Sequence, residues 1–166
     1  MEEMLDVVDD DDKVVRMAPR KEVREKGLLH RCARAIVKND NEEIMLQKRA
    51  MAKDIYPGQW DIGIAETVKS GESYNDAAIR GLHEEAGING DKSSLKFLFK
   101  FRYKSKINNT ITSAYEYYHN GAVHPQEEEV DEVKFLSKDK LPELMQKEKF
   151  HPVGKIIFEK YMEAKK

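Results

Sequence analysis

The sequence predicts one domain of the α/β or α+β class, a sandwich of strands and helices. Short runs rich in β-branched and aromatic residues alternate along the chain with a smaller number of helical patterns. The length of 166 residues fits one domain whose core needs no disulfide or metal to hold it together. The hydrophobic content of 40% and the charged content of 36% are typical of an ordinary soluble globular protein.

The first part of the chain predicts a hairpin. Leu5–Val8 and Lys13–Met17 are short β-prone runs, and we expect the acidic turn between them to be solvated. The stretch Asp9–Lys13 also spells a protease cleavage tag, which would lie outside any argument about the fold. Because Val14 and Val15 continue the strand pattern, the pattern favours native sequence over a tag.

A core follows the hairpin. We expect a single domain over residues 1–166, with 1–27 as the hairpin and lead-in and 28–166 as the core. The long connection Arg49–Trp60 is of the type that often carries function. The expected strands are His30–Val37, Ile44–Gln47, Leu95–Tyr103, Ile111–His119 and Val133–Leu136. The expected helices are Ser73–Ala86, Asp139–Lys147 and the amphipathic Val153–Ala164.

The clearest of these helices begins at Ser73. Its side chain can cap the first turn, and Asp76 at the third helical position comes close to completing a capping box. The helix is expected to run to about Ala86, where Gly87 closes it.

Charge and cysteine content limit the function classes. The net charge of −2, from 29 basic and 31 acidic residues, gives no basic face for nucleic acid, so we expect no nucleic-acid partner. The single cysteine, Cys32, cannot form a disulfide within the chain, which favours a reducing compartment. No apolar run approaches the roughly 20 residues of a membrane span. We therefore expect a cytoplasmic protein without a membrane partner, and a homodimer stays open.

Glu84 and Glu85 are the first candidates for chemistry. Both can face one side of the helix, and adjacent carboxylates repel each other unless a cation lies between them. Hard cations such as Mg²⁺ or Mn²⁺ bind carboxylate oxygens while also gripping a substrate's phosphates. Arg80, one turn earlier, can brace a carboxylate, and Glu72 favours the positive end of the helix dipole. The alternative is a solvated, charged helix face.

The run from residue 66 to residue 88 resembles the Nudix box, the sequence pattern of the Nudix hydrolase superfamily. That pattern is G-x5-E-x7-R-E-U-x-E-E-x-G-U, where U is an aliphatic residue. The chain matches it at Glu72, Arg80, Leu82, Glu84, Glu85, Gly87 and Ile88. It departs at two positions, with Glu66 where the pattern has glycine and Gly81 where it has glutamate.

The resemblance implies a Nudix α/β/α sandwich with a mixed central sheet, a Nudix helix at about 73–86 and a C-terminal helix. It also implies hydrolysis of a nucleoside diphosphate linked to another moiety, a small-molecule diphosphate substrate, and Mg²⁺ or Mn²⁺ as the cofactor. The site residues that it implies are Glu84, Glu85 and Arg80 for catalysis, with Glu72 and Gly87 as structural parts of the motif.

A second resemblance precedes the box. Leu46–Arg49, Lys53-Asp54 and Tyr56–Trp60 look like the lead-in shared by isopentenyl diphosphate isomerases and their hydrolase relatives. The likeness favours that isomerase-like subgroup and implies that Arg49 and Lys53 bind the diphosphate. Plain surface charge is the alternative for both residues.

The two departures from the pattern have opposite chemistry. In the family, the position of Gly81 carries one of three metal-binding glutamates, and the position of Glu66 lies where the loop approaches the metal. We therefore expect a carboxylate swap, in which Glu66 joins Glu84 and Glu85 as a metal ligand. The alternative is two independent losses, which would leave a slow or inactive protein.

Two other functions stay open. A non-catalytic nucleotide- or diphosphate-binding protein would be consistent with the loss at Gly81. An isopentenyl diphosphate isomerase would need a cysteine around Ile64–Ala65 and paired glutamates on a later strand, where Ile111–Tyr118 offers Glu116 alone. Either the swap or the acidic run Glu127–Glu129 could supply the missing carboxylate of a hydrolase.

Overall fold

The computed structural model describes residues 2–53 and 55–166, so Asp54 of the lead-in resemblance lies outside the described residues. The strands are β1 (Met4–Val8), β2 (Val14–Pro19), β3 (His30–Lys38), β4 (Glu43–Arg49), β5 (Trp60–Ile62), β6 (Ile64–Thr67), β7 (Lys96–Lys104), β8 (Asn109–Tyr118) and β9 (Val130–Ser137). The helices are α1 (Arg20–Lys26), α2 (Tyr74–Ala86), the 3₁₀ turn η1 (Lys92–Ser94), α3 (Leu141–Lys147) and α4 (Pro152–Ala164).

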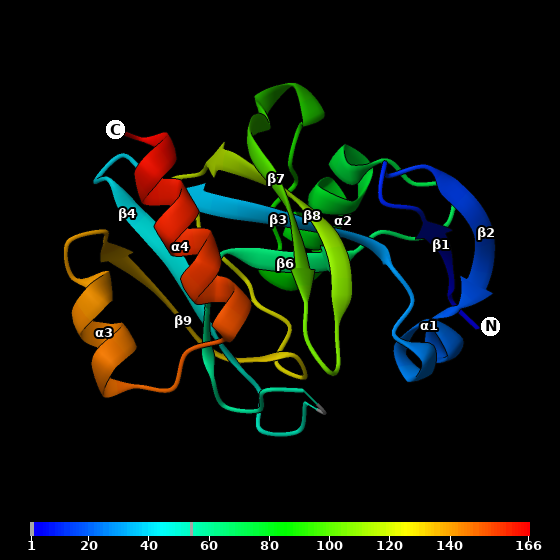
Figure 1. Ribbon diagram of the computed structural model, residues 1–166. Coiled ribbons are helices and arrows are strands. Elements are labelled where there is room, and N and C mark those ends of the chain that lie inside the picture. The colour runs from blue at the N-terminus through cyan, green and yellow to red at the C-terminus, as the bar shows by residue number, and fades with distance from the viewer. Residues whose placement is uncertain (1, 54) are drawn as a thin grey trace.

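The core is a mixed sheet between helices, as the sequence predicted. Its strand order is β5-β4-β3-β8-β7, with β6 also pairing with β3 and β9 with β4. The β3–β8 pair is parallel, and the other pairs in this sheet are antiparallel. Helices α2 and α4 cover opposite faces, while β1, β2 and α1 form a separate unit at one end (Figure 1). No described helix is long and apolar enough to cross a membrane.

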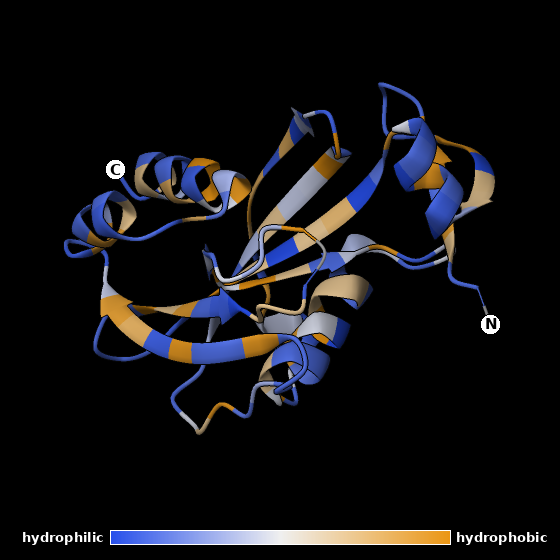
Figure 2. Cartoon of the chain, turned by 90° about the horizontal axis from the view of Figure 1, so that it is seen from below, coloured by the Kyte–Doolittle hydropathy of each residue, from blue (hydrophilic) through white to orange (hydrophobic). Residues whose placement is uncertain are grey.

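Alternation along β3 explains the two helical layers. Successive side chains of a strand point to opposite faces, so Ala35 and Val37 share one face and Ile36 lies on the other. The first two pack with Leu82 of α2, and Ile36 packs with Ile157 of α4. Hydrophobic positions follow the central strands, whereas α1 is largely hydrophilic (Figure 2). One sheet therefore supports both helices through the two sides of the same strand.

Helix α2 has the ends that the sequence predicted. The Ser73 side chain accepts a hydrogen bond from Asp76 N, and the Asp76 carboxylate accepts one from Ser73 N, which completes the capping box. Gly87 closes the helix with a φ of 66°, a left-handed conformation that glycine adopts without strain. A Cβ at Gly87 would also lie 2.9 Å from His124 Cβ.

Strands β5 and β6 were not among the expected strands: β5 begins at Trp60, where the expected connection ends, and β6 contains Glu66, which was expected in a loop. Gly63 separates them with a φ of 64°, and a Cβ there would lie 2.0 Å from the carbonyl oxygen of Ala35. Glycine thus lets the chain leave β4, the partner of β5, and pair with β3 instead. The strand pairing places Glu66 of β6 opposite Ala33 of β3. The side chain of Glu66 lies on the side of β6 that faces α2.

Glu116, the only glutamate of β8, anchors the C-terminal helix. It is buried, and its two carboxylate oxygens accept hydrogen bonds from Tyr161 Oη at 2.6 Å and Lys165 Nζ at 2.9 Å. Burial opposes its charge, but these two hydrogen bonds lower the pKa of Glu116 below its ordinary value. The residue holds α4 against the sheet.

The acidic turn of the hairpin is only partly solvated, which corrects the expectation for Asp12. Its carboxylate accepts hydrogen bonds from Arg31 Nε at 2.7 Å, Tyr74 Oη at 2.9 Å and Lys100 Nζ at 2.9 Å. Burial alone would raise the pKa of Asp12, but the three donors lower it. The turn therefore joins the hairpin to β3, α2 and β7, a tertiary contact that local turn patterns do not reveal.

These contacts predict resistance to the protease that recognises four aspartates followed by lysine. Arg31→Ala removes donors to both the carboxylate and the carbonyl oxygen of Asp12, each at 2.7 Å, and leaves the cleavage sequence intact. Because cleavage of a folded chain requires local opening, we expect cutting after Lys13 to accelerate by about tenfold or more, as read by mass spectrometry. Arg102→Ala, which removes an exposed pair with Asp10, should change little. Equal cleavage of the wild type and Arg31→Ala would contradict this prediction.

Candidate functional site

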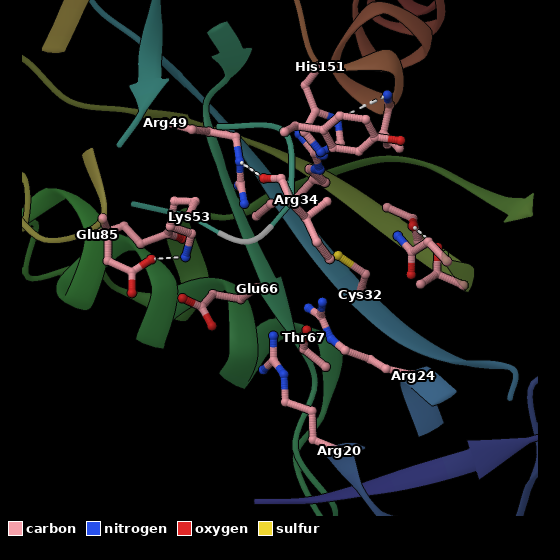
Figure 3. A pocket seen from close by; sticks show the side chains of 18 of the residues that line it. Arg20, Arg24, Cys32, Arg34, Arg49, Lys53, Glu66, Thr67, Glu85 and His151 are labelled. Carbon is pink, nitrogen blue, oxygen red and sulfur yellow. Dashed lines mark hydrogen bonds and ion pairs between the residues drawn. The ribbon is translucent and has the colours of Figure 1, made fainter. Parts of the chain in front are cut away.

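A cleft of about 330 Å³ opens between α2, β6 and the loop after β4, with α1 at one end (Figure 3). Helix, strand and loop each contribute charged side chains to it. The acidic lining residues include Glu66, Glu84, Glu85 and Glu129, and the basic ones Arg20, Arg24, Arg34, Arg49, Lys53 and Arg80. Six of the eight site residues predicted from the sequence therefore lie in one cleft.

The remaining two predicted residues, Glu72 and Gly87, do not line the cleft. Gly87 ends α2, and Glu72 forms hydrogen bonds that stabilise the turn before this helix. The Glu72 carboxylate accepts a hydrogen bond from Lys69 N at 2.8 Å and two from Arg80, at 2.9 Å and 3.0 Å. Burial opposes the charge of Glu72, but these donors lower its pKa. Glu72 thereby closes the turn between β6 and α2 and fixes Arg80.

Arg80 connects strand, loop and helix. Its Nη1 donates to Glu66 at 2.8 Å and to Glu84 at 3.3 Å, and its Nη2 donates to the Thr67 carbonyl oxygen at 2.9 Å. The hydrogen bonds from Arg80 to Glu72 raise the pKa of the guanidinium further above its ordinary value. Arg80 is therefore a fixed cation that orients the carboxylates of β6 and α2.

The two departures from the box pattern lie in contact. An ideal Cβ built at Gly81 would be 2.4 Å from Glu66 Cγ and 2.7 Å from Ile64 Cδ1. Both neighbours come from β6, whose residues 64 and 66 point to the same face. The side chain of Glu66 thus occupies the space beside the helix at position 81.

Glu85 is the carboxylate with unsatisfied bonding capacity. Its Oε2 atom is buried and has no hydrogen-bond partner. Burial raises the pKa of Glu85 well above its ordinary value, and the negative charge of Glu66 raises it further. Burial likewise raises the pKa of Glu66, against the opposing effect of Arg80. Because Glu66 and Glu85 repel each other when both are charged, they favour binding of a proton or a cation at this end of the cleft.

The donor set suits a hard divalent cation. Glu66, Glu84 and Glu85 offer carboxylate oxygens, the ligands that Mg²⁺ and Mn²⁺ prefer, and Glu85 Oε2 is free of protein partners. Within residues 2–53 and 55–166, no three acidic, histidine or cysteine side chains already converge closely enough to hold one ion. Glu66 and Glu84 are instead hydrogen-bonded to Arg80.

Arg49, the last residue of β4, and Lys53, in the loop that follows it, line the same cleft (Figure 3). Arg49 Nε donates to the Ile55 carbonyl oxygen at 3.0 Å, which fixes the bend of the loop. Lys53 forms an ion pair with Glu129, so the acidic run before β9 also reaches the cleft. These cations face the carboxylates of α2 and β6.

Sequence reasoning missed a buried ion pair beside the cleft, of which Arg34 is a lining residue. Arg34 of β3 donates to Asp61 of β5 at 2.7 Å, and their side chains are 4% and 2% exposed. Arg34 Nε is buried without a partner. The two residues are far apart in the sequence, and no local pattern indicates that β3 and β5 bring them together.

A model of the NUDIX domain matches residues 28–160 of the chain. The protein belongs to the Nudix family. An uncharacterized Nudix hydrolase of Streptomyces coelicolor is 37% identical over 154 residues, which cover 92% of this chain and 84% of that protein. An uncharacterized Nudix hydrolase of Pseudomonas aeruginosa is 32% identical over 134 residues, covering 81% of this chain and 78% of that protein.

Solved structures share the Nudix fold. The crystal structure of DR0079 from Deinococcus radiodurans superposes with a TM-score of 0.77 at 21% identity and covers 96% of this chain and 99% of that one. The NUDIX domain of Shewanella oneidensis NrtR, solved in complex with ADP ribose, has a TM-score of 0.65 at 16% identity, with 83% and 88% coverage. The mixed sheet between helices agrees with these neighbours and confirms the predicted fold class.

The raised pKa of Glu85 on the Nudix helix predicts a pH-dependent stability change. A carboxylate whose pKa is higher in the folded state destabilises that state as pH rises above its unfolded value of about 4.5. With a chelator present, Glu85→Gln should therefore melt a few degrees above the wild type at pH 8, with a gap that narrows toward pH 4.5. Glu143→Gln, which changes an exposed carboxylate of α3, should show no such gain by differential scanning calorimetry. A gap that stays constant with pH would contradict the prediction.

Proposed function

We propose that the protein is a Mg²⁺- or Mn²⁺-dependent diphosphohydrolase that acts on a nucleoside diphosphate derivative. The observation that carries the proposal is one cleft that holds the unsatisfied carboxylate of Glu85 opposite the cations Arg49 and Lys53. Membership of the Nudix family supports hydrolase chemistry with a divalent metal.

Each group of side chains has a distinct task in this mechanism. Glu84 and Glu85 would hold the cation, and a bound Mg²⁺ or Mn²⁺ would supply Lewis-acid chemistry, polarising a phosphoryl oxygen and acidifying the attacking water. Glu85, in its ionised form, would accept that water's proton on Oε2, the oxygen that has no protein partner. Arg80 positions Glu84 through the contact at 3.3 Å. Arg49 and Lys53 neutralise the charge that develops on the departing phosphate.

The other end of the cleft suits a planar group. Tyr56 and His151 contact each other edge to face with ring centroids 4.5 Å apart, and both line the cleft together with Tyr103. Burial lowers the pKa of His151 to about 4, so its ring is neutral near pH 7. An aromatic wall next to cations fits a nucleobase attached to a diphosphate. The ADP ribose bound to the NrtR domain has this composition, which supports the substrate class.

A substrate panel tests the proposal. Purified protein is incubated with nucleoside di- and triphosphates, sugar nucleotides, ADP ribose and isopentenyl diphosphate, first with Mn²⁺ and then with EDTA. We expect metal-dependent release of phosphate or a nucleoside monophosphate, and a loss of about 10²–10⁴ in kcat for Glu85→Gln. Glu143→Gln is the matched control and should retain full turnover. Stabilisation by ligands without any turnover would favour the non-catalytic binding protein instead.

Arg49 and Lys53 generate a separate kinetic prediction. Arg49→Ala and Lys53→Ala each remove one charged contact to the diphosphate, so we expect KM to rise about tenfold. The turnover number should fall less than in Glu85→Gln, because neither residue holds the cation or receives the proton. Unchanged KM values would assign both residues to plain surface charge.

Within the family, we propose the subgroup that resembles isopentenyl diphosphate isomerases, and we propose hydrolysis rather than isomerisation. Glu116 is bound to Tyr161 and Lys165 and does not line the cleft. Cys32 does line it, but burial raises the pKa of its thiol to about 11, so the thiol stays protonated near pH 7. Conversion of isopentenyl diphosphate into its isomer in the panel would overturn this choice.

A further inference from the structure

We propose that Glu66 of β6 supplies the third metal-binding carboxylate of this site, and that position 81 of the Nudix helix is glycine because Glu66 occupies its side-chain space. The metal-binding part of the inference rests on the proposed function. The steric part concerns the folded protein alone and can be tested separately.

The steric part explains a glycine that is otherwise unfavourable. Gly81 lies in the middle of α2, where glycine costs roughly 1 kcal/mol relative to alanine. Its φ is not positive, in contrast to Gly87 at the end of the same helix, so backbone conformation does not require it. The distance of 2.4 Å between a Cβ at position 81 and Glu66 Cγ gives the physical reason. No residue with a Cβ fits there unless Glu66 moves.

The carboxylate of Glu66 points to the other proposed ligands. Its Oε2 shares the donor Arg80 Nη1 with Glu84, at 2.8 Å and 3.3 Å. Glu66 and Glu85 line the same cleft, and the Glu66 carboxylate points toward Glu85, the residue with the unpartnered buried oxygen (Figure 3). One strand carboxylate and two helix carboxylates therefore surround the same end of the cleft.

The backbone holds Glu66 in this place. Its strand pairs with β3 through Glu66 opposite Ala33, and Arg80 is itself fixed by Glu72 and the Thr67 carbonyl oxygen. A ligand supplied from a paired strand is as well positioned as one supplied from a helix. Two independent losses would give no reason for the side chain at position 66 to occupy the space of the side chain missing at position 81.

The steric claim is tested with alanine, the smallest side chain that has a Cβ. In the wild-type background, Gly81→Ala should lower Tm, because the methyl group meets Glu66 Cγ and Ile64 Cδ1. In a Glu66→Gly background, the same change should raise Tm, because the closer contact is gone, the terminal methyl of Ile64 can turn into the space that Glu66 leaves, and alanine favours a helix. Calorimetry in EDTA reads this change of sign without any metal or substrate. The same shift of Tm in both backgrounds would overturn the claim that Glu66 occupies the side-chain space of position 81.

The metal claim is tested by Mn²⁺ affinity, measured by titration calorimetry without substrate. Glu66→Gln keeps the side-chain volume but removes a charged ligand, so we expect Mn²⁺ to bind at least tenfold more weakly. Glu66→Gly and Gly81→Glu should each bind more weakly than the wild type. The double variant restores the family pattern and should bind more tightly than either single variant. Glu143→Gln controls for the general loss of one negative charge.

The outcomes separate this inference from the proposed function. Wild-type affinity in Glu66→Gln would overturn Glu66 as a ligand, and so would an absence of Mn²⁺ binding in the wild type. Mn²⁺ binding that depends on Glu66, together with no turnover of any substrate in the panel, would support the carboxylate exchange and contradict the hydrolase. A double variant that binds no better than Gly81→Glu would also overturn the exchange.

Discussion

The guanidinium of Arg80 is the interaction on which the rest of the site depends. It binds the carboxylates of Glu66, Glu72 and Glu84 and a carbonyl oxygen of β6, so one side chain joins strand, turn and helix. Like-charged carboxylates would otherwise repel one another in a partly buried cleft. Because Arg80 donates hydrogen bonds to three of these carboxylates, they can remain close together, while Glu85 keeps an oxygen without a partner.

The fold supplies that arrangement through the sheet. Strand β3 has the Nudix helix on one face and α4 on the other, and it pairs with β6 along one edge and β8 along the other. The strand therefore determines where β6 lies relative to α2. Other cations reach the cleft by a different route, from the end of β4 and the loop after it and from α1 of the N-terminal unit.

Local chemistry explains which features the sequence could predict. The ends of the Nudix helix were predictable because Ser73 and Asp76 cap its first turn and Gly87 its last, each through contacts local in the chain. The spacing of the motif predicted the acidic residues of the cleft. Helix α1 was not predictable, because it has seven residues and buries Val23 alone, so tertiary packing rather than propensity forms it. The contacts of Asp12 and the Arg34–Asp61 pair join segments far apart in the chain, where no local rule applies.

Gly63 has a consequence for how this part of the chain can vary. Since Gly63 fixes the point at which β6 begins and side chains alternate along a strand, residue 66 faces α2 only because it lies an odd number of positions after the glycine. Insertion or deletion of one residue between them would turn the carboxylate to the opposite face, whatever the amino acid. The length of this short segment is therefore constrained more tightly than its composition.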